Sequence, residues 1–200
     1  MKMRLSAIGA VVLAVAAFTG IPRADAAPDP LAFVNDLGTQ AIQVLGPTMS
    51  MQQRLARFRE LFHNDFDVPG IGRFVLGRYW RSASPEEQQD FLKLFQEYIV
   101  QAYSTRLGAY GGEPFRVTGT RSSGDDIVVT SEVVRQNSGP VSVEWHLIDQ
   151  DGQFKITDVY VGGISMKVTE RDEFGAIIQR NGGQVAALLT QLRQKIGAEN

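Results

Sequence analysis

The spacing of the apolar residues changes twice along the chain, and this pattern limits the possible folds more than any other feature. From Leu31 to about Tyr110 apolar residues recur at every third or fourth position, which is typical of helices that bury one face. From Phe115 to Met166 they alternate with polar residues, which is typical of strands with one buried face. Helical spacing returns from Thr169 onward. Helices, then strands, then helices predict an α+β fold, in which helices cover one face of a curved, mainly antiparallel sheet.

Capping residues mark the expected helix starts. Ser50 and Gln53 have the spacing of a capping box, in which each side chain bonds the backbone N–H of the other residue. Residues 84–87, Ser-Pro-Glu-Glu, combine a second such box with proline at the first helical position. Two closing helices are expected over residues 169–181 and 184–196.

Turn residues divide the alternating region into strands. Clusters of Ser, Gly, Asn and Asp separate four alternating segments, so we expect a four-stranded antiparallel sheet with hairpin connections. In each segment every second residue is mostly apolar, and these alternating residues lie within 115–117, 127–133, 141–147 and 154–156. The alternation breaks over residues 159–163, Val-Tyr-Val-Gly-Gly, which predicts a bulge or a bend.

The first residues have the features of a secretion signal. Two basic residues precede an apolar stretch over residues 5–18 and an Ala-x-Ala cleavage motif that ends at Ala26. The apolar stretch is shorter than the ~20 residues that a membrane-spanning helix needs. We therefore expect a cleaved signal peptide over residues 1–26, a single folded domain over residues 27–200, and export to the periplasm.

The composition excludes several kinds of chemistry. The chain has no cysteine, which removes thiolate metal sites and cysteine nucleophiles, and its two histidines are too few for a typical zinc centre. A formal net charge of -2 at pH 7 gives no broad basic field for nucleic-acid binding. We therefore expect no metal, no cofactor and no nucleic-acid partner.

Asp158 lies among apolar strand residues, two positions before Tyr160. An acid and a phenol in an apolar cavity can transfer a proton next to a carbonyl group, so the pair is a candidate for enzyme chemistry. Alternatively, Asp158 is a structural carboxylate that pairs with Arg73 or Arg171. The residues themselves leave both interpretations open.

The bulky apolar residues are compatible with a packed core or with a pocket. The region before Tyr110 holds most of the aromatic residues, while the strands carry mid-sized Val and Ile on their apolar phase. A concave sheet backed by helices can enclose a pocket for an apolar ligand. Over residues 73–81 arginines alternate with aromatic residues, as in a solvated helix face or in a phosphate contact.

Two blocks of the sequence resemble a known family. Residues 67–81, Asp-Val-Pro-Gly-Ile-Gly-Arg-Phe-Val-Leu-Gly-Arg-Tyr-Trp-Arg, followed by Ser-Pro-Glu-Glu-Gln, are similar to the MlaC or toluene-tolerance family of periplasmic phospholipid-binding proteins. Residues 155–159, 163–166 and 171–174 resemble the final strand of that family and the start of its closing helix. The family contains a branch associated with hopanoids, which stays open as an alternative.

The resemblance implies a fold related to nuclear transport factor 2, with acyl chains between sheet and helices and the headgroup outside. It implies a carrier, not an enzyme, that moves glycerophospholipid between an outer-membrane lipoprotein–porin complex and an inner-membrane ABC transporter and so maintains outer-membrane lipid asymmetry. We expect the carrier to be a monomer. The alternative is an enzyme of the same cone-shaped fold that acts on an apolar carbonyl substrate through Asp158 and Tyr160.

Strand phase and helix spacing predict which side chains meet the acyl chains. These candidates are Phe74, Phe91, Phe95, Tyr98, Val129, Val143, Trp145 and Ile156. The charges expected to meet the headgroup or to stabilise the fold are Arg73, Arg78, Arg81, Asp158 and Arg171.

Overall fold

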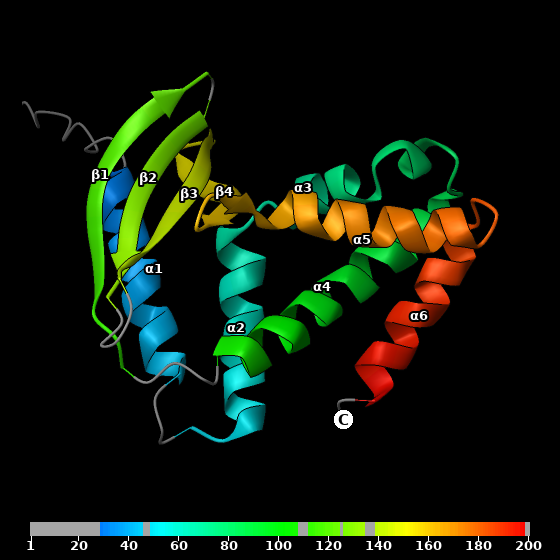
Figure 1. Cartoon of the computed structure of the whole chain (residues 1–200), viewed down its shortest axis with the longest axis horizontal. Helices are drawn as coiled ribbons and strands as arrows, with labels where there is room; N and C mark the ends of the chain where they lie inside the picture. The colour runs from blue at the N-terminus through cyan, green and yellow to red at the C-terminus, as the bar shows by residue number, and fades with distance from the viewer. Residues whose placement is uncertain (1–28, 46–48, 108–111, 125, 135–138, 199–200) are drawn as a thin grey trace, which may run out of the picture.

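The computed structural model (Figure 1) has the predicted order of elements, with helices first, a sheet in the middle and helices at the end. It describes residues 29–45, 49–107, 112–124, 126–134 and 139–198. The predicted signal peptide, residues 1–26, lies outside the described residues. In the described part of the chain, no helix is both long and apolar enough to cross a membrane.

The helices begin close to the positions that the capping residues predict. The helical elements are α1 Pro30–Leu45, α2 Met51–Asp65, α3 Val68–Leu76, the 3-10 turn η1 Gly77–Arg81, α4 Pro85–Leu107, α5 Met166–Arg180 and α6 Val185–Ala198. At the start of α2 the Ser50 hydroxyl accepts from the Gln53 N–H at 3.3 Å, and the Gln53 side chain accepts from the Ser50 N–H at 2.9 Å. Ser84 and Glu87 form the same reciprocal pair of bonds at the start of α4. Both predicted capping boxes are therefore confirmed.

The strands form an antiparallel sheet in which each strand pairs with the next along the chain. In the described residues these strands are β1 Phe115–Ser123, β2 Asp126–Val133, β3 Val141–Gln150, β4 Gln153–Val161 and β5 Ile164–Ser165. The four predicted strands are confirmed, and the two-residue β5 extends the sheet beyond β4. Asp151 and Gly152 turn the chain between β3 and β4 with positive φ angles of 55° and 81°, which matches the turns that join twisted hairpin strands.

A β-bulge at Thr157 changes which side chains of β4 point inward. The pairing of β3 with β4 shifts its register at this point, so that Thr157 lies opposite no residue of β3. An extra residue moves the alternation by one position. Ile156 before the bulge and Val159 after it therefore both pack on the inner face. This bulge lies just ahead of the segment 159–163, and within the segment the chain turns at Gly162 and Gly163, with φ angles of 58° and 81°, so the predicted bend is confirmed.

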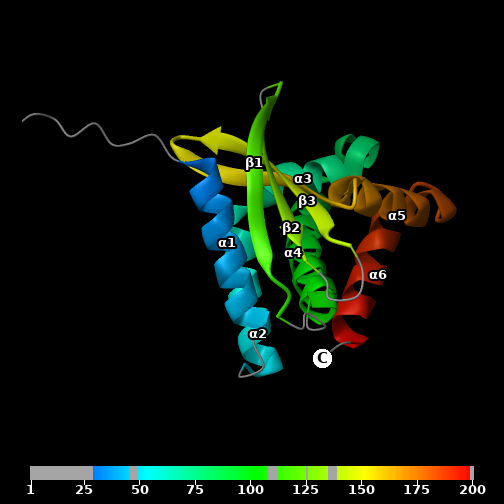
Figure 2. The same cartoon turned by 60° about the vertical axis from the view of Figure 1, so that its left-hand side comes forward.

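Buried apolar side chains of the described residues form two clusters. The helical core joins α2 to α6 and is centred on Phe91, Phe95 and Phe174, whose rings contact one another. The sheet core packs α1 on the inner face of the strands through residues such as Val34 and Ile156. Figure 1 and Figure 2 show α1 along the concave side of the curved sheet, with α4 and α6 farther from the strands, and Figure 1 shows α5 beginning beside β4 and running away from the sheet. The space between the two cores holds the candidate site.

Candidate functional site

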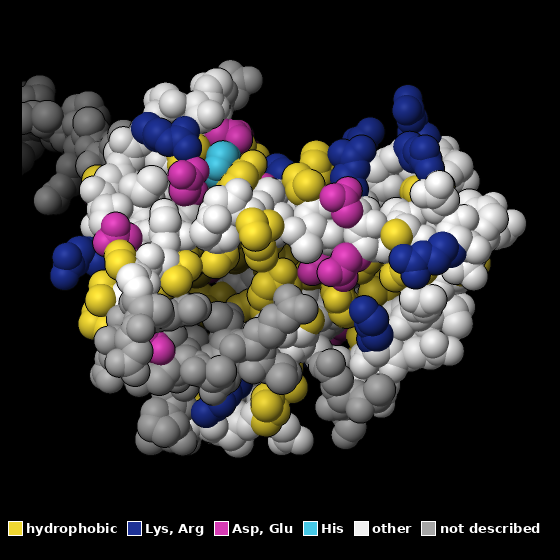
Figure 3. All heavy atoms as spheres, in the orientation of Figure 1, with side chains coloured by type: hydrophobic (Ala, Val, Ile, Leu, Met, Phe, Trp, Pro, Cys, Tyr) yellow, Lys and Arg dark blue, Asp and Glu magenta, His cyan; other side chains and the backbone are white. Residues whose placement is uncertain are grey.

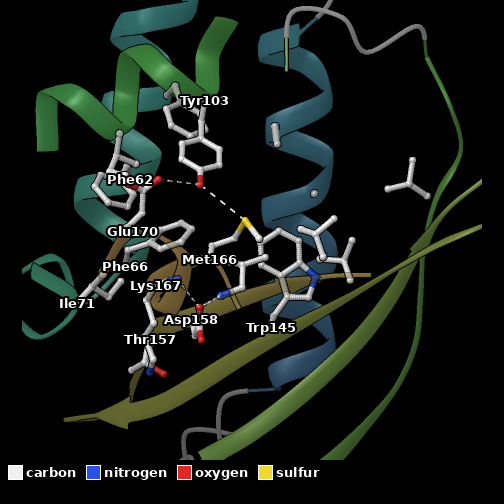
Figure 4. Close-up of a pocket in the computed structure, with 18 of the residues that line it drawn as sticks. Phe62, Phe66, Ile71, Tyr103, Trp145, Thr157, Asp158, Met166, Lys167 and Glu170 are labelled. Atoms are coloured by element: carbon white, nitrogen blue, oxygen red, sulfur yellow. Dashed lines mark hydrogen bonds between the residues drawn. The ribbon is translucent and has the colours of Figure 1, made fainter. Parts of the chain in front are cut away.

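A pocket with a volume of about 520 Å³ lies between the helical core and the sheet core. This volume is in the ~300–1,000 Å³ range of small-molecule sites. Its wall takes side chains from α1 to α5 on one side and from β1 to β4 on the other (Figure 4). The pocket therefore fills the gap between the helical core and the sheet core.

Most of the pocket wall is apolar. Aromatic side chains from both cores line it, among them Phe62, Phe66, Phe95, Phe115 and Trp145. Figure 3 shows hydrophobic side chains gathered in the hollow between the sheet and the helices. Such a wall offers dispersion contacts and excludes water, so it favours an apolar ligand or the apolar part of an amphiphile.

Trp145 is held in the wall by a buried hydroxyl. Its indole Nε1 donates a hydrogen bond of 2.9 Å to the Ser131 hydroxyl on the neighbouring strand. Its ring also meets Phe115 of β1 edge to face, with ring centres 6.4 Å apart. The hydrogen bond satisfies the polar end of the indole, which leaves the remainder of the ring as apolar pocket surface.

An ion pair joins α2 and α4, two of the helices that form the pocket wall. Arg59 of α2 donates to both carboxylate oxygens of Glu97 on α4, at 2.9 Å and 2.7 Å. Hydrogen bonding to this carboxylate raises the pKa of the Arg59 guanidinium above its ordinary value. The two-bond geometry fixes the spacing of α2 and α4 better than a single contact would.

A polar cluster interrupts the apolar wall between α4 and α5. The Tyr103 hydroxyl donates to Glu170 Oε1 at 3.3 Å and lies 3.7 Å from the sulfur of Met166 (Figure 4). Glu170 is only 4% exposed. Burial of a carboxylate is costly unless donors surround it, so the tyrosine hydroxyl stabilises Glu170 in this position.

Asp158 ties strand β4 to the first turn of α5. It is 3% exposed, and its carboxylate accepts from the Val159 N–H at 2.8 Å, the Lys167 N–H at 3.1 Å and the Ser165 hydroxyl at 2.5 Å. Ser165 in turn accepts from the Val168 N–H at 3.1 Å and is the N-cap of α5. A helix N-terminus carries free N–H groups and partial positive charge, which favour a carboxylate there. This cap also explains why α5 begins before the predicted start at residue 169.

The predicted ion pair between Asp158 and an arginine is wrong. Neither Arg73 nor Arg171 is among the ion-pair partners found in the described residues. Arg73 is exposed on α3, and the Arg171 guanidinium lies over the ring of Phe74, 4.9 Å from its centre. The donors of the α5 turn already satisfy the carboxylate, so no arginine is needed beside it.

Asp158 and Tyr160 do not share the pocket. Asp158 lines it, whereas the Tyr160 ring stacks on His146 with the ring centres 4.6 Å apart and is not part of the pocket wall. Proton transfer at one substrate atom needs both groups within hydrogen-bond reach of that atom. The arrangement therefore does not favour the enzyme interpretation.

The structure brings some predicted lining residues together and separates others. Phe95, Val143 and Trp145 line the pocket. Phe91 and Tyr98 are buried in the helical core, Val129 and Ile156 are buried in the sheet core, and Phe74 faces a smaller cavity beside α3. Lipid contact by any of these side chains stays a prediction.

The remaining predicted charges are exposed. Arg78 donates to the Tyr79 hydroxyl at 2.8 Å, and Arg78 and Arg81 both lie in η1. Neither lines the main pocket.

Sequence reasoning missed the contribution of α1 and α2 to the wall. Gly38, Ala41 and Ile42 from α1 and Phe58 and Phe62 from α2 line the pocket. Helical spacing identifies most of these positions as buried, but it carries no signal that distinguishes a residue beside a cavity from one in a filled core.

The fold and the site define an α+β protein with an apolar ligand-binding pocket between sheet and helices. A family model described as "MlaC protein" matches residues 38–194, and the chain belongs to this family.

Two relatives from other organisms have similar sequences. Toluene tolerance protein ttg2D of Pseudomonas putida is 29% identical over 121 residues, which cover 60% of this chain and 56% of that protein. The intermembrane phospholipid transport system binding protein MlaC of Haemophilus influenzae is 27% identical over 145 residues, which cover 68% and 67% of the two chains. The match therefore spans little more than half of the Pseudomonas relative.

A solved structure shares the fold. The phospholipid-binding protein of Ralstonia solanacearum, determined in complex with a phospholipid, superposes with a TM-score of 0.72 at 21% identity, covering 86% of this chain and 99% of that chain. The predicted α+β architecture is thus confirmed by comparison as well as by the strand and helix order.

Proposed function

We propose that the chain is a periplasmic carrier that binds the acyl chains of a glycerophospholipid in the pocket between its two cores. The observation that carries this proposal is the apolar cavity of about 520 Å³, walled by side chains from both cores. Membership of the MlaC family and the name of the Haemophilus relative support phospholipid as the ligand class. The bound phospholipid of the Ralstonia protein agrees with this choice.

The apolar wall matches what transfer of a lipid through water demands. Each methylene removed from water contributes ~0.8 kcal/mol, so the roughly 30 methylenes of a diacyl lipid oppose spontaneous escape by about 25 kcal/mol. A pocket that shields these methylenes removes most of this barrier. Ordering of the acyl chains offsets part of the gain, so the carrier can also release its ligand.

The proposed partners follow from the family. We propose that the carrier is loaded and unloaded at an outer-membrane lipoprotein–porin complex and an inner-membrane ABC transporter, the partners that the resemblance to the MlaC family implies. The carrier needs no catalytic residue for this task, and the carboxylate of Asp158 has a structural role in the cap of α5.

Lipid extraction from the purified mature protein tests the proposal. We expect glycerophospholipid at close to one molecule per chain, measured by mass spectrometry of the organic extract against a protein quantification. An extract without stoichiometric lipid would contradict the carrier function. An extract dominated by hopanoids would replace the proposed ligand by the alternative one.

A further inference from the structure

A smaller cavity adjoins the lipid pocket beside the N-terminal end of α3. Its volume is about 280 Å³, and it shares Ile71, Thr157 and Lys167 with the main pocket. Figure 4 shows these shared residues at the end of the main pocket that lies away from Tyr103. A ligand whose apolar part fills the main pocket can therefore extend a polar part into the smaller cavity.

The smaller cavity carries charges of both signs. Two carboxylates line it, Asp67 at the start of α3 and Asp126 at the start of β2, together with the ammonium-bearing Lys167. The Lys167 ammonium lies 4.9 Å from the ring centre of Phe74, which lines only the smaller cavity. Lys167 thus lines both cavities, and its ammonium lies on the side of the smaller one.

These charges do not neutralise one another. Among the ion pairs of the described residues, none joins Lys167 to Asp67 or Asp126. Asp67 accepts from the Gly70 N–H at 3.1 Å, and Asp126 lies 3.6 Å from His146 Nδ1. Each of these contacts involves one oxygen of a carboxylate. A carboxylate accepts hydrogen bonds at both oxygens, so each aspartate can also accept from a ligand. The smaller cavity thus offers a cation on a residue that it shares with the lipid pocket, and acceptors on two residues that line the smaller cavity alone.

A zwitterionic headgroup has the complementary order of charges. In a glycerophospholipid with a terminal primary ammonium, the phosphate is nearer to the acyl chains and the ammonium is farther away. Lys167, which lines both cavities, suits the phosphate, and the carboxylates of Asp67 and Asp126 suit the ammonium, which is a donor of three hydrogen bonds. A headgroup without an amine would leave the two carboxylates facing a polar group that carries no positive charge.

We propose that the smaller cavity is a headgroup subsite that selects glycerophospholipids ending in a primary ammonium, with Lys167 as the phosphate contact and Asp67 and Asp126 as the ammonium contacts. This inference rests on the proposed carrier function. It adds a specificity that the apolar pocket cannot provide, because acyl chains are the same in lipids with different headgroups.

Lipid exchange with mixed vesicles tests the subsite. The purified mature protein is incubated with vesicles of equal parts phosphatidylethanolamine and phosphatidylglycerol, separated from them, and extracted for mass spectrometry. For the wild type we expect phosphatidylethanolamine to be enriched by roughly three- to tenfold, the scale of a partly exposed charge-assisted contact. The double variant Asp67→Asn/Asp126→Asn is expected to take up both lipids equally, with the total lipid per chain unchanged.

The variants are chosen so that a change in lipid enrichment cannot come from a loss of folding or from the change in net charge. Asparagine caps helices as well as aspartate does, so Asp67→Asn is expected to retain α3. The control variant Asp172→Asn/Glu173→Gln removes two exposed carboxylates from α5 and has the same net charge as the double variant. This control is expected to keep the wild-type enrichment.

Each outcome bears on one of the two proposals. Equal uptake by the wild type at one lipid per chain, unchanged enrichment in the double variant, or loss of enrichment in the control would each overturn the subsite and leave the carrier function intact. Absence of lipid from every protein would instead contradict the carrier function. If the double variant does not fold by circular dichroism, Asp126→Asn alone is measured and is expected to show reduced enrichment, and unchanged enrichment there would overturn the subsite.

Discussion

At the scale of single residues, Asp158 shows how a carboxylate is accommodated in an apolar wall. Its bonds come from the backbone and the cap of α5, so its loss is expected to loosen the joint between β4 and α5. Asp158→Asn keeps the shape of the side chain but replaces one carboxylate oxygen by an amide NH₂ group. This group is a donor and cannot accept the hydrogen bonds that the carboxylate receives. We expect a loss of about 1–3 kcal/mol in the free energy of unfolding, measured by urea titration. Glu173→Gln, at an exposed position of α5, serves as the control and is expected to have little effect; an equal effect of both variants would contradict the structural role.

Val143 tests the position of the pocket wall. It is 7% exposed and lines the pocket, whereas the adjacent Ser142 is exposed on the opposite face of β3. Val143→Glu places an unpaired carboxylate against the acyl chains, which costs several kcal/mol, and is expected to abolish lipid retention. Ser142→Glu is expected to keep the lipid. Circular dichroism first establishes that both variants fold, and equal lipid content by mass spectrometry would show that this face is not the wall.

At the scale of secondary-structure elements, two helix-interior glycines differ in what a side chain would meet. A Cβ at Gly38 of α1 would lie 2.3 Å from the ring of Phe115 on β1, whereas a Cβ at Gly175 of α5 would meet nothing within 4 Å. Alanine in an open helix position stabilises by roughly 0.5–1 kcal/mol, and overpacking costs roughly 1–3 kcal/mol. We therefore expect Gly175→Ala to raise and Gly38→Ala to lower the urea midpoint. Shifts of the same sign would mean that the close approach of α1 to β1 does not limit the packing.

The C-terminal end of α2 carries a carboxylate in an unfavourable place. Burial raises the pKa of Asp65 above its ordinary value, and the positive charge of Lys155 opposes part of the rise. The folded protein thus holds this proton more tightly than the unfolded chain. The contribution of Asp65 to stability is therefore lost as pH rises from below ~3.9, the ordinary pKa of Asp, through the raised folded value.

Asp65→Asn removes this penalty. We expect the variant to be more stable than the wild type at neutral pH and to lose that advantage as the pH is lowered through the same range. Urea midpoints at a series of pH values measure the difference. Asp172→Asn, an exposed position, is expected to show no such trend, and a wild type that is more stable than Asp65→Asn at neutral pH would contradict the argument.

At the scale of the whole molecule, the pocket lies between two apolar cores that each pack within themselves. Removal of lipid is therefore expected to leave the helix and strand content unchanged by far-ultraviolet circular dichroism. A ligand that binds only the folded state at 100 times its Kd stabilises it by about 2.7 kcal/mol. For a chain of this size this corresponds to a rise in Tm of roughly 5–10 °C. Re-addition of phospholipid vesicles is expected to restore this Tm, and an unchanged Tm after delipidation would contradict binding in the pocket.

The sequence by itself determined the elements and their order, because the signals for them are local. The Ser50 and Ser84 capping boxes place the starts of α2 and α4, and alternation places β1 to β4. The two blocks around residues 67–81 and 155–174 indicated the family. A cap depends on atoms three residues apart, and a strand phase on neighbours two apart, so both can be predicted without knowledge of distant contacts.

Only the tertiary structure decided where the cavity lies. Val143 and Ile156 both belong to apolar strand phases, yet the first lines the pocket while the second is buried in the sheet core, where it pairs with Phe66. The bulge at Thr157 turns Val159 inward, and the start of α5 brings the Lys167 N–H and the Ser165 hydroxyl to Asp158 in place of an arginine. A cavity exists where two packed cores fail to meet, and that depends on the positions of many elements at once. No short stretch of sequence contains this information. A residue beside a cavity and a residue in a filled core are both apolar and have the same spacing along the chain.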